Sequence, residues 1–562
     1  MVRFSTRMNL LKGSAIRELL ALANKPEILS FAGGMPAPEL FPVDKIKAAT
    51  DAVLEEQGKV ALQYSSTNGF EHFRQQIADR MEAKLNIKTT ADNILVTSGS
   101  QQGLDYSARV FCDKGDVVII ESPSYLGALN AFKACEPNFV AIPTDGDGMI
   151  MEELEKVLAT TENVKMIYVI PDFQNPSGRT WPLERRKQFM EIINKYEIPV
   201  VEDNPYGELR FEGEYLPALK SMDTKGLVVF LGTFSKILAP GYRLGWVCAD
   251  GEILQKYNFL AQAASLQAST EAQLVVSKFI DMFDLDEHVA TIKECYRKRR
   301  DVMIQTMERE FPPEAKFTHP NGGLFTWVEL PDYINTNEMA KQCLARNVAY
   351  VPGDGFFPDA GHNNCIRLNY SCMPEEKIEQ GMTILGEVIK ENIKVRRFTR
   401  YEGVCSAYVH GGGTHGILVN FETTNDIDAK DEFVAYGKDI AMQVAAANPG
   451  YVDEASVPAE VVAKEKEIML AQMAQDPKTA NKPEAVKEKM IEGKIKKFFK
   501  ENCLVDQEFV KDGDLTVAQY TAKVAKDLGG EIKIVKFARF VKGEGLEKRA
   551  DDFASEVASM VK

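Results

Sequence analysis

Short apolar runs that alternate with helical segments constrain the fold of this chain more than any other feature. Residues 164–170 (VKMIYVI), 198–202 and 226–231 (GLVVFL) are such runs, and residues 185–196 have helical periodicity. Strands that are apolar throughout are typical of parallel sheets with helices on both faces. The sequence therefore predicts an α/β fold with a mostly parallel central sheet.

A polar loop follows each of the first two runs. Asn175 lies in the loop after residues 164–170, and Asp203 and Tyr206 follow residues 198–202. A single Asn or Asp beside proline is usually only a turn residue. Ligands of open α/β sheets, however, bind beside the carboxyl ends of the strands, so we expect these three side chains to share one site.

The third run leads into LGTFSKILAPGYRLGW, the most specific motif of the chain. Lys236 can react with a carbonyl compound only if its amine is partly deprotonated, and burial beside other cations favours that state. Thr233, Ser235 and Arg243 supply donors suited to a phosphate. The motif predicts a site for a phosphorylated carbonyl compound. The alternative is a strand-turn-strand with a surface lysine.

Two more loops are suited to completing such a site. A strand over residues 94–97 is followed by SGSQQG, where Ser100 and Gln101 begin a predicted helix whose N–H groups would face an anion. A strand over residues 116–121 leads to SPSY, whose Tyr125 could stack on the ring of a ligand. The alternative for Tyr125 is a core or rim position.

Arg367 lies within a later predicted strand, in the sequence CIRLNYS. An unpaired guanidinium between apolar neighbours would be costly. A ligand carboxylate is one suitable partner, because it matches the guanidinium fork through two hydrogen bonds. A buried Asp or Glu of the same chain is the alternative partner.

These motifs, with SFAGGMPAPELFP near the amino terminus, resemble the class I, fold-type I aminotransferases that use pyridoxal 5′-phosphate (PLP). The resemblance covers residues 1 to about 390, and it is closer to the 2-aminoadipate (LysN-like) and kynurenine aminotransferase group. It implies a fold-type I α/β domain, a small α+β domain and PLP as the cofactor. It also implies ping-pong amino transfer between an amino acid, such as 2-aminoadipate or glutamate, and a 2-oxo acid.

The resemblance assigns a role to each motif residue. Lys236 would hold PLP and move the substrate proton, Asp203 would face the pyridine nitrogen, and Arg367 would bind the α-carboxylate. The implied cofactor contacts are Ser100, Gln101, Tyr125, Asn175, Asp203, Tyr206, Thr233, Ser235, Lys236, Arg243 and Tyr64. The implied substrate contacts are Arg17, Gly34, Asn175 and Arg367. Other PLP chemistries, such as decarboxylation and β-elimination, would use the same lysine and aspartate.

Two of these residues carry further implications. Tyr64 in LQYSSTNGF stands where the family presents a tyrosine to the phosphate of the neighbouring subunit, which implies a homodimer. Arg17 in SAIRELL, on a predicted helix over residues 14–23, stands where the adipate-type enzymes read a side-chain carboxylate.

The sequence changes character after a predicted helix over residues 375–390. A strand-rich stretch begins at residue 393, with a turn over residues 408–413 and another strand over residues 416–421. Two amphipathic helices between residues 458 and 504 flank a polar breaker and predict an antiparallel hairpin. Its predicted contacts join Ile468, Met469 and Met473 to Met490, Ile491, Ile495 and Phe498. Nothing in this stretch suggests nucleophile, metal or phosphate-loop chemistry, so we expect an interaction module.

The segments DIAMQVAAANPGYV and EKMIEGKIKKFFKENCLVDQEFVKD resemble the carboxyl-terminal part of elongation factor Ts. The resemblance implies elongation factor Tu as a partner. The T-D-F-V segment of that family is not reproduced at residues 422–426, and its amino-terminal helical domain has no counterpart in the sequence. We therefore expect binding rather than nucleotide exchange. An elongation factor with a passive aminotransferase domain is the alternative function.

We expect four regions: an arm and substrate helix (1–45), a PLP-binding large domain (46–285), a small domain (286–390) and an elongation-factor-Ts-like module (391–562). No Gly/Ser-rich or Pro-rich linker joins the last two. A gene fusion, an engineered fusion and an assembly error would all produce such a join.

The composition excludes several classes of protein. A net charge of −15 argues against general nucleic-acid or membrane binding. The nine cysteines and six histidines lack metal-ligand spacing, so we expect no metal site. There is no recognisable signal peptide or membrane-length apolar run, and we expect a cytoplasmic protein. The charged run over residues 293–300 is predicted to be a solvated helix face.

Overall fold

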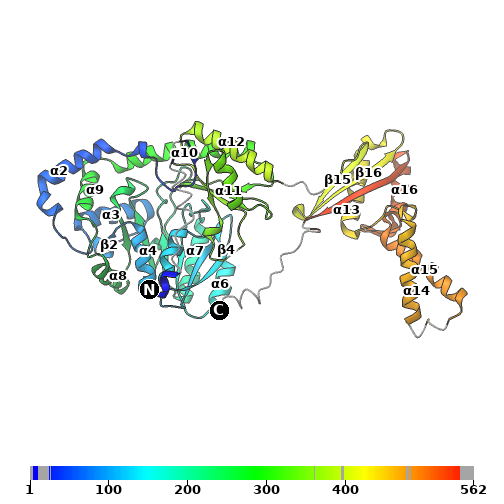
Figure 1. Ribbon diagram of the computed structural model, residues 1–562, viewed down its shortest axis with the longest axis horizontal. Coiled ribbons are helices and arrows are strands. Elements are labelled where there is room, and N and C mark those ends of the chain that lie inside the picture. The colour runs from blue at the N-terminus through cyan, green and yellow to red at the C-terminus, as the bar shows by residue number, and fades with distance from the viewer. Residues whose placement is uncertain are drawn as a thin grey trace. The chain divides into compact units, whose positions relative to one another are not determined.

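The computed structural model describes residues 4–9, 25, 27–359, 361–393, 398–475, 479, 482–542 and 544. The chain forms two compact units, Met1–Lys394 and Val395–Lys562 (Figure 1). The helix predicted over residues 14–23, which contains Arg17, lies outside the described residues. No described helix combines the length and the apolar content that a membrane span requires.

An eight-stranded sheet forms the centre of the first unit, in the order β2-β9-β8-β7-β6-β3-β4-β5. Its strands are β2 (Ile94–Thr97), β3 (Val117–Ser122), β4 (Asn138–Asp145), β5 (Gly148–Met149), β6 (Val164–Val169), β7 (Val200–Asp203), β8 (Val228–Thr233) and β9 (Gly245–Cys248). The strands from β8 to β4 run parallel, whereas β9 is antiparallel to both of its neighbours and β5 is antiparallel to β4. The prediction of a mostly parallel sheet is confirmed.

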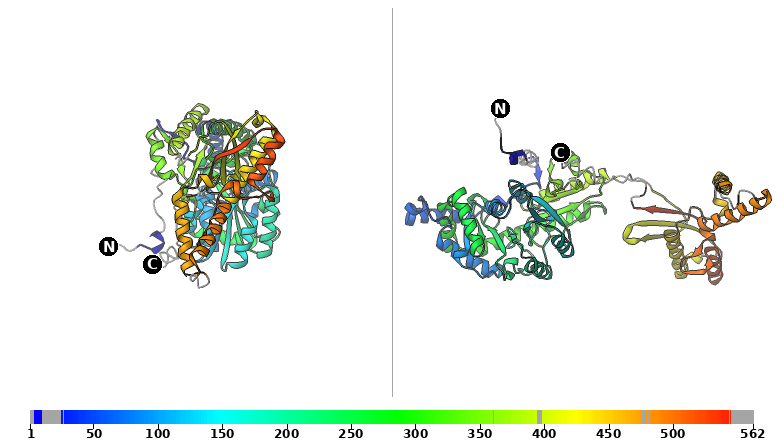
Figure 2. Two further views of the ribbon diagram at one scale, coloured as in Figure 1. Left: turned by 90° about the vertical axis from the view of Figure 1, so that its right-hand side faces the viewer. Right: turned by 90° about the horizontal axis from the view of Figure 1, so that it is seen from below.

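Helices cover both faces of this sheet, as Figures 1 and 2 show. Alternate residues of a strand point to opposite faces, so the apolar strands contribute to two cores. Ile120 of β3 packs in one core with α4 (Ser100–Phe111), α5 (Leu126–Lys133) and α8 (Gly251–Ala264). Ile119 packs in the other with α6 (Met151–Thr160) and α7 (Leu183–Tyr196). Continuous apolar strands follow from this double burial.

Three more helices pack beside the β2 edge and extend the larger apolar core. They are α2 (Val43–Ala61), α3 (Glu71–Leu85) and α9 (Thr270–Met282). Helix α9 contacts both α2 and α3.

The rest of the first unit is a smaller α+β region. Its antiparallel sheet has the order β10 (Lys316–Phe317), β11 (Phe325–Glu329), β14 (Cys365–Asn369) and β13 (Val351–Pro352). Its helices are α10 (Leu285–Glu310), α11 (Thr336–Ala345) and α12 (Glu375–Asn392). Near the amino terminus, β1 (Leu29–Ser30) pairs in parallel with β12 (Val348–Ala349). The segment after β1 is thereby joined to the smaller region.

The charged run on α10 is only partly solvated, so the prediction for it is wrong at two positions. Arg299 and Arg300 are just 5% and 6% exposed. Arg299 pairs with Glu39 and donates to the Ser371 carbonyl, while Arg300 pairs with Glu212. Helix α10 places these guanidiniums against buried carbonyls and acidic side chains of other segments, which sequence periodicity does not reveal.

The second unit is built on an antiparallel sheet, β15 (Val404–His410), β16 (His415–Thr423) and β19 (Ile532–Val541). Helices α13 (Asp431–Ala447) and α16 (Val517–Leu528) contact it, and β17 (Glu508–Phe509) pairs with β18 (Asp512–Thr516). The turn predicted over residues 408–413 is wrong in part, because residues 408–410 extend β15 and the turn spans Gly411–Gly413. The backbone freedom of glycine places the reversal there.

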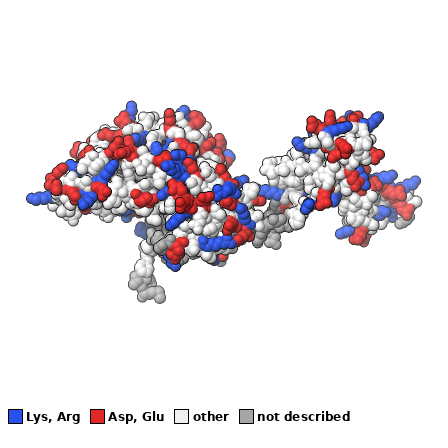
Figure 3. Space-filling model, turned by 90° about the horizontal axis from the view of Figure 1, so that it is seen from above, with Lys and Arg blue, Asp and Glu red and all other residues white. Residues whose placement is uncertain are grey.

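Helices α14 (Ala459–Gln475) and α15 (Glu484–Asn502) pack against each other, which confirms the predicted helical hairpin. Met473, Ile491 and Ile495 form its buried centre. Two predicted contacts differ, because Ile468 is 40% exposed and Phe499, rather than Phe498, packs against the buried centre. Basic and acidic side chains are mixed on the surface seen in Figure 3, without one large patch of either sign.

Candidate active site

Lys236 follows β8 and lies at the centre of the candidate site. Its amine donates a hydrogen bond to the Gly34 carbonyl at 2.7 Å. Burial lowers the pKa of the Lys236 amine to about 8, and the cationic Arg367 and Arg243 act in the same direction. A useful fraction of the amine is therefore neutral near neutral pH, as attack on a carbonyl requires.

Asp203 ends β7, the strand next to β8, and is 2% exposed. The Tyr168 hydroxyl donates to its Oδ2 at 3.0 Å, while its Oδ1 is buried without a hydrogen-bond partner among the described residues. Burial raises the pKa of the Asp203 carboxyl to about 7. A protonated ring nitrogen would satisfy the free oxygen and stabilise the ionised carboxylate.

Arg367 reaches the same site from β14 of the smaller region. It donates to Asn175 Oδ1 at 3.0 Å and to the Ala32 carbonyl at 2.7 Å, and the rings of Phe325 and Phe356 lie 4.3 and 5.1 Å from the guanidinium carbon. Neither of these hydrogen-bond partners is a carboxylate, contrary to the alternative of a buried Asp or Glu partner. Burial lowers the pKa of Arg367 to about 10. The enclosed cation is suited to an acidic ligand.

A cluster of donors surrounds the start of α4. A Cβ added at Gly99, whose φ is +75°, would lie 2.6 Å from Arg243 Nη2. The Arg243 guanidinium therefore packs directly against the residue that precedes α4. Arg243 Nη1 lies 3.5 Å from Ser235 Oγ, which in turn lies 2.9 Å from Thr233 Oγ1. These hydroxyls, the guanidinium and the N–H groups that begin with Ser100 can together hold a phosphate.

Tyr125 precedes α5 and is close enough to Asp203 and Arg367 to interact with both electrostatically. Burial raises the pKa of its hydroxyl, so the ring is neutral and suited to stacking. The Gln101 side chain is used differently, because its amide donates to the Gly127 carbonyl at 2.9 Å. This bond uses one of the two N–H donors of the Gln101 amide.

The structure brings most of the predicted residues together. Lys236, Asp203, Asn175, Tyr206, Arg367, Tyr125, Thr233, Ser235, Arg243, Ser100 and Gly34 all come from segments that meet at this site. Tyr64 does not join them, because it is 77% exposed and lies with Gln63 and Gln267 at a surface hollow. Arg17 is outside the described residues.

Sequence reasoning missed Tyr168 and the two phenylalanines beside Arg367. In the sequence, Tyr168 lies within an apolar run. The register of the sheet nevertheless indicates that its side chain lies near Asp203. Tyr168 pairs with Val201, so it lies on the same face of the sheet as Asp203, two residues further along β7. Phe325 and Phe356 are far from Arg367 in sequence, and no local pattern marks their contact.

These residues fit PLP. The free Asp203 oxygen is suited to the pyridine nitrogen, the donors around Gly99 to the phosphate, and the Lys236 amine to the aldehyde carbon. Tyr125 and the Asn175–Tyr206 pair supply an aromatic face and polar groups for the ring and its hydroxyl.

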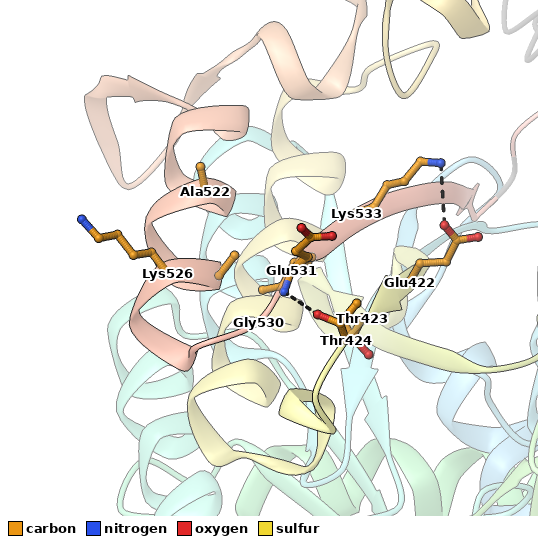
Figure 4. Close-up of a pocket in the computed structure, with 10 residues that line it drawn as sticks. Glu422, Thr423, Thr424, Ala522, Lys526, Gly530, Glu531 and Lys533 are labelled. Atoms are coloured by element: carbon orange, nitrogen blue, oxygen red, sulfur yellow. Dashed lines mark hydrogen bonds and ion pairs between the residues drawn. The ribbon is translucent and has the colours of Figure 1, made fainter.

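A groove in the second unit has a different character (Figure 4). It is bordered by the ends of β16 and β19 and by α16. Lys533 pairs with Glu422 at 3.6 Å, and the Glu531 N–H donates to Thr424 Oγ1 at 2.9 Å. These two contacts join the end of β16 to the start of β19 and the turn before it.

Comparison with known proteins finds two family matches along the chain. Residues 34–385 match the family "Aminotransferase class I and II", and residues 356–544 match "Elongation factor TS". The aromatic-amino-acid aminotransferase 1 of Thermococcus litoralis is 44% identical over 395 residues, which cover 70% of this chain and 95% of the relative.

Solved structures agree with this assignment. The multiple substrate aminotransferase of Thermococcus profundus is 43% identical with a TM-score of 0.67, and the match covers 69% of this chain and 97% of that one. LysN, the α-aminoadipate aminotransferase of Thermus thermophilus, was solved with N-(5′-phosphopyridoxyl)-L-leucine. It is 37% identical with a TM-score of 0.65, over 69% of this chain and 97% of that one.

The family match covers more than half of the chain, and the phosphopyridoxyl group in the LysN structure agrees with the arrangement around Lys236 and Asp203. The chain therefore belongs to the aminotransferase class I and II family as a PLP-dependent enzyme, and it contains in addition a domain of the elongation factor Ts family.

Proposed function

We propose that the enzyme transfers the amino group of 2-aminoadipate or glutamate to a 2-oxo acid by a ping-pong mechanism, and that it also accepts aromatic or branched-chain amino acids. The observation that carries this proposal is Arg367, a buried guanidinium held by an amide and a carbonyl rather than by a carboxylate. Such a group is suited to the α-carboxylate of an amino acid. The names of the relatives support a range of substrates that includes 2-aminoadipate and aromatic amino acids.

The chain's own residues divide the chemistry between them. PLP, when bound, supplies an electron sink that stabilises negative charge at the substrate Cα. Lys236 would take the proton from Cα as a general base and, as a general acid, would deliver it to C4′, the former aldehyde carbon of PLP, for which a pKa near 8 is well matched. Asp203 would hold a proton on the pyridine nitrogen through its free Oδ1.

The remaining site residues would orient the reactants. Asn175 and Tyr206 would contact the ring hydroxyl, Tyr125 the ring face, and Arg367 the α-carboxylate. Ser100, Gln101, Thr233, Ser235 and Arg243 would hold the phosphate, and Gly34 and Arg17 would border the substrate. Phe325 and Phe356 flank the Arg367 guanidinium and shield it from water, which strengthens its attraction for a carboxylate.

The exposure of Tyr64 supports a homodimer. Tyr64 and Leu62 are 77% and 76% exposed, and the nearby Leu266 is also exposed. A tyrosine that binds the phosphate of a neighbouring subunit would have to lie outside the site of its own chain. We propose that a second copy covers this surface and receives Tyr64 at its phosphate site.

The second unit supports a second candidate function, binding to elongation factor Tu. The match to elongation factor Ts spans residues 356–544. The retained set of Lys236, Asp203, Arg243 and Arg367 argues against a passive aminotransferase domain, so we propose that the second unit is an added binding module. We also propose the four regions predicted from the sequence (1–45, 46–285, 286–390 and 391–562) and a cytoplasmic location.

The first prediction concerns the Lys236 amine. Since its pKa is lowered to about 8 and only the neutral amine reacts, the rate at which the apoprotein acquires the visible absorbance band of bound PLP should rise through pH 8. Below that pH the rate should fall about tenfold per pH unit. Lys236→Ala should show no such band, and a wild-type midpoint near the ordinary lysine pKa would contradict the assigned environment.

The second prediction concerns substrate choice. Arg17→Gln should lower kcat/KM for 2-aminoadipate and glutamate by roughly 10- to 100-fold, the value of a charge-assisted hydrogen bond, and leave leucine nearly unchanged. Steady-state kinetics with a panel of amino acids would measure this. Equal losses for all substrates would show that Arg17 does not read the distal carboxylate.

The third prediction concerns the dimer. Tyr64→Ala should weaken PLP binding by roughly 10- to 100-fold, because a hydrogen bond to the charged phosphate is lost. In mixed dimers with Lys236→Ala, the intact lysine site would receive an intact Tyr64 from its partner, so tight PLP binding should return in half of the sites. Mixed dimers that bind as weakly as Tyr64→Ala alone would refute the shared site.

The fourth prediction concerns the second unit. The full chain should be retained by immobilised elongation factor Tu in the GDP state, and elongation factor Ts should displace it. It should not accelerate GDP release, since the T-D-F-V segment is not reproduced at residues 422–426. Absence of retention at micromolar concentration would refute the binding function, and accelerated GDP release would refute the restriction to binding.

A further inference from the structure

Glu121 of β3 is a buried carboxylate that none of the steps above uses. It is 2% exposed. The Trp181 indole donates to its Oε1 at 3.0 Å, while the Ile170 N–H and the Gln174 amide donate to its Oε2 at 3.4 and 3.5 Å. Burial raises the pKa of the Glu121 carboxyl to about 7. Burying an ionised acid costs free energy unless hydrogen bonds compensate for the lost contact with water.

The contacts of Glu121 join two loops of the cofactor site. The Gln174 amide that reaches Glu121 also donates to the Pro123 carbonyl at 2.6 Å. Pro123 lies two residues before Tyr125, and Gln174 directly precedes Asn175. One amide therefore ties the loop that carries the stacking ring to the loop that carries Asn175.

The same amide also shapes the Asn175 loop from within. Gln174 Oε1 accepts hydrogen bonds from the Ser177 N–H at 2.9 Å and from the Ser177 hydroxyl at 2.6 Å. Trp181, which closes this loop, is fully buried with its indole on Glu121. Glu121 thus contacts the loop through Gln174 just before Asn175 and through Trp181 six residues after it.

Asn175 in turn sets the direction of Arg367, because Asn175 Oδ1 accepts from Arg367 Nη1 at 3.0 Å. A shift of the loop backbone would move this oxygen away from the guanidinium. It would also move the Asn175 amide relative to the neighbouring Tyr206 hydroxyl.

We infer that Glu121 is a positioning residue of this enzyme. Through Gln174 and Trp181 it fixes the loops that present Asn175 and Tyr125, and it thereby sets both the orientation of Arg367 toward the α-carboxylate and the polar contact to the ring hydroxyl of PLP. This inference rests on the roles proposed above for Asn175 and Arg367.

The chemistry of the contacts explains why a carboxylate is needed. Three N–H donors converge on Glu121, and an ionised carboxylate supplies two acceptor oxygens for them. A glutamine has nearly the same shape, but it has one acceptor oxygen and turns an NH₂ group toward the remaining donors. Glu121→Gln therefore forces a local rearrangement of the loops without a large change in volume.

The experiment compares Glu121→Gln with the wild type as PLP-loaded full-length protein. KM for the amino acid should rise at least fivefold with a smaller change in kcat, because Arg367 is misplaced. The pH midpoint of the visible absorbance band should also move by at least half a pH unit, because the contact to the ring hydroxyl changes. A merely structural role would lower the thermal midpoint and leave both of these readouts at wild-type values.

Asp223→Asn is the matched control. The Asp223 side chain is also buried, accepts backbone hydrogen bonds from Leu227 at 3.1 Å and Val228 at 2.9 Å, and pairs in addition with Lys220 at 3.0 Å. It lies five residues before β8 and binds the N–H of Val228, the first residue of that strand, whereas the cofactor loops follow the carboxyl ends of the strands. This variant should lose stability and keep the wild-type KM and band titration.

Gln174→Met tests the same contact from the other side and keeps the inference testable if Glu121→Gln does not fold. It should change KM and the band midpoint in the same direction as Glu121→Gln, and the double variant should be less than additive. Wild-type KM and band titration in either folded variant would overturn the inference. A wild-type protein without a visible PLP band or turnover would instead overturn the proposed function.

Discussion

The burial of ionisable side chains at the carboxyl edge of the sheet is the constraint on which this site depends. Asp203 and Glu121 both sit near strand ends, and burial raises their pKa values to about 7, whereas it lowers that of Lys236 to about 8. Lys236 can therefore act as both base and acid near neutral pH, whereas Asp203 and Glu121 need nearby hydrogen-bond donors to remain ionised. The hydrophobic cores on both faces of the sheet make this possible, because they exclude water from the strand ends.

A second constraint is that the site is assembled from two regions of the first unit. Lys236 and Asp203 come from the large sheet, Arg367 comes from the smaller sheet, and the segment after β1 contacts both. Its Ala32 carbonyl accepts from Arg367 and its Gly34 carbonyl accepts from Lys236. The cationic groups thus share one stretch of backbone, which holds them beside each other before any ligand binds.

The second unit differs from the first in its architecture. Its core is an antiparallel sheet covered by α13 and α16, with a separate apolar cluster in the α14–α15 hairpin. In its groove, Lys533 pairs with Glu422 and the Glu531 N–H donates to Thr424. The proposed binding to elongation factor Tu belongs to this unit, whereas the cofactor site lies in the first unit.

The sequence by itself determined the strands of the central sheet, the loops that end them and the lysine motif, because continuous apolar runs and glycine-rich turns are local signals. Only the tertiary structure decided that Tyr168 supports Asp203, that Asn175 holds Arg367 and that Arg299 and Arg300 are buried. These contacts join residues that are 35 and 192 positions apart in the first two cases. Their energies depend on packing between distant segments, and no periodicity within a single segment encodes such a partner.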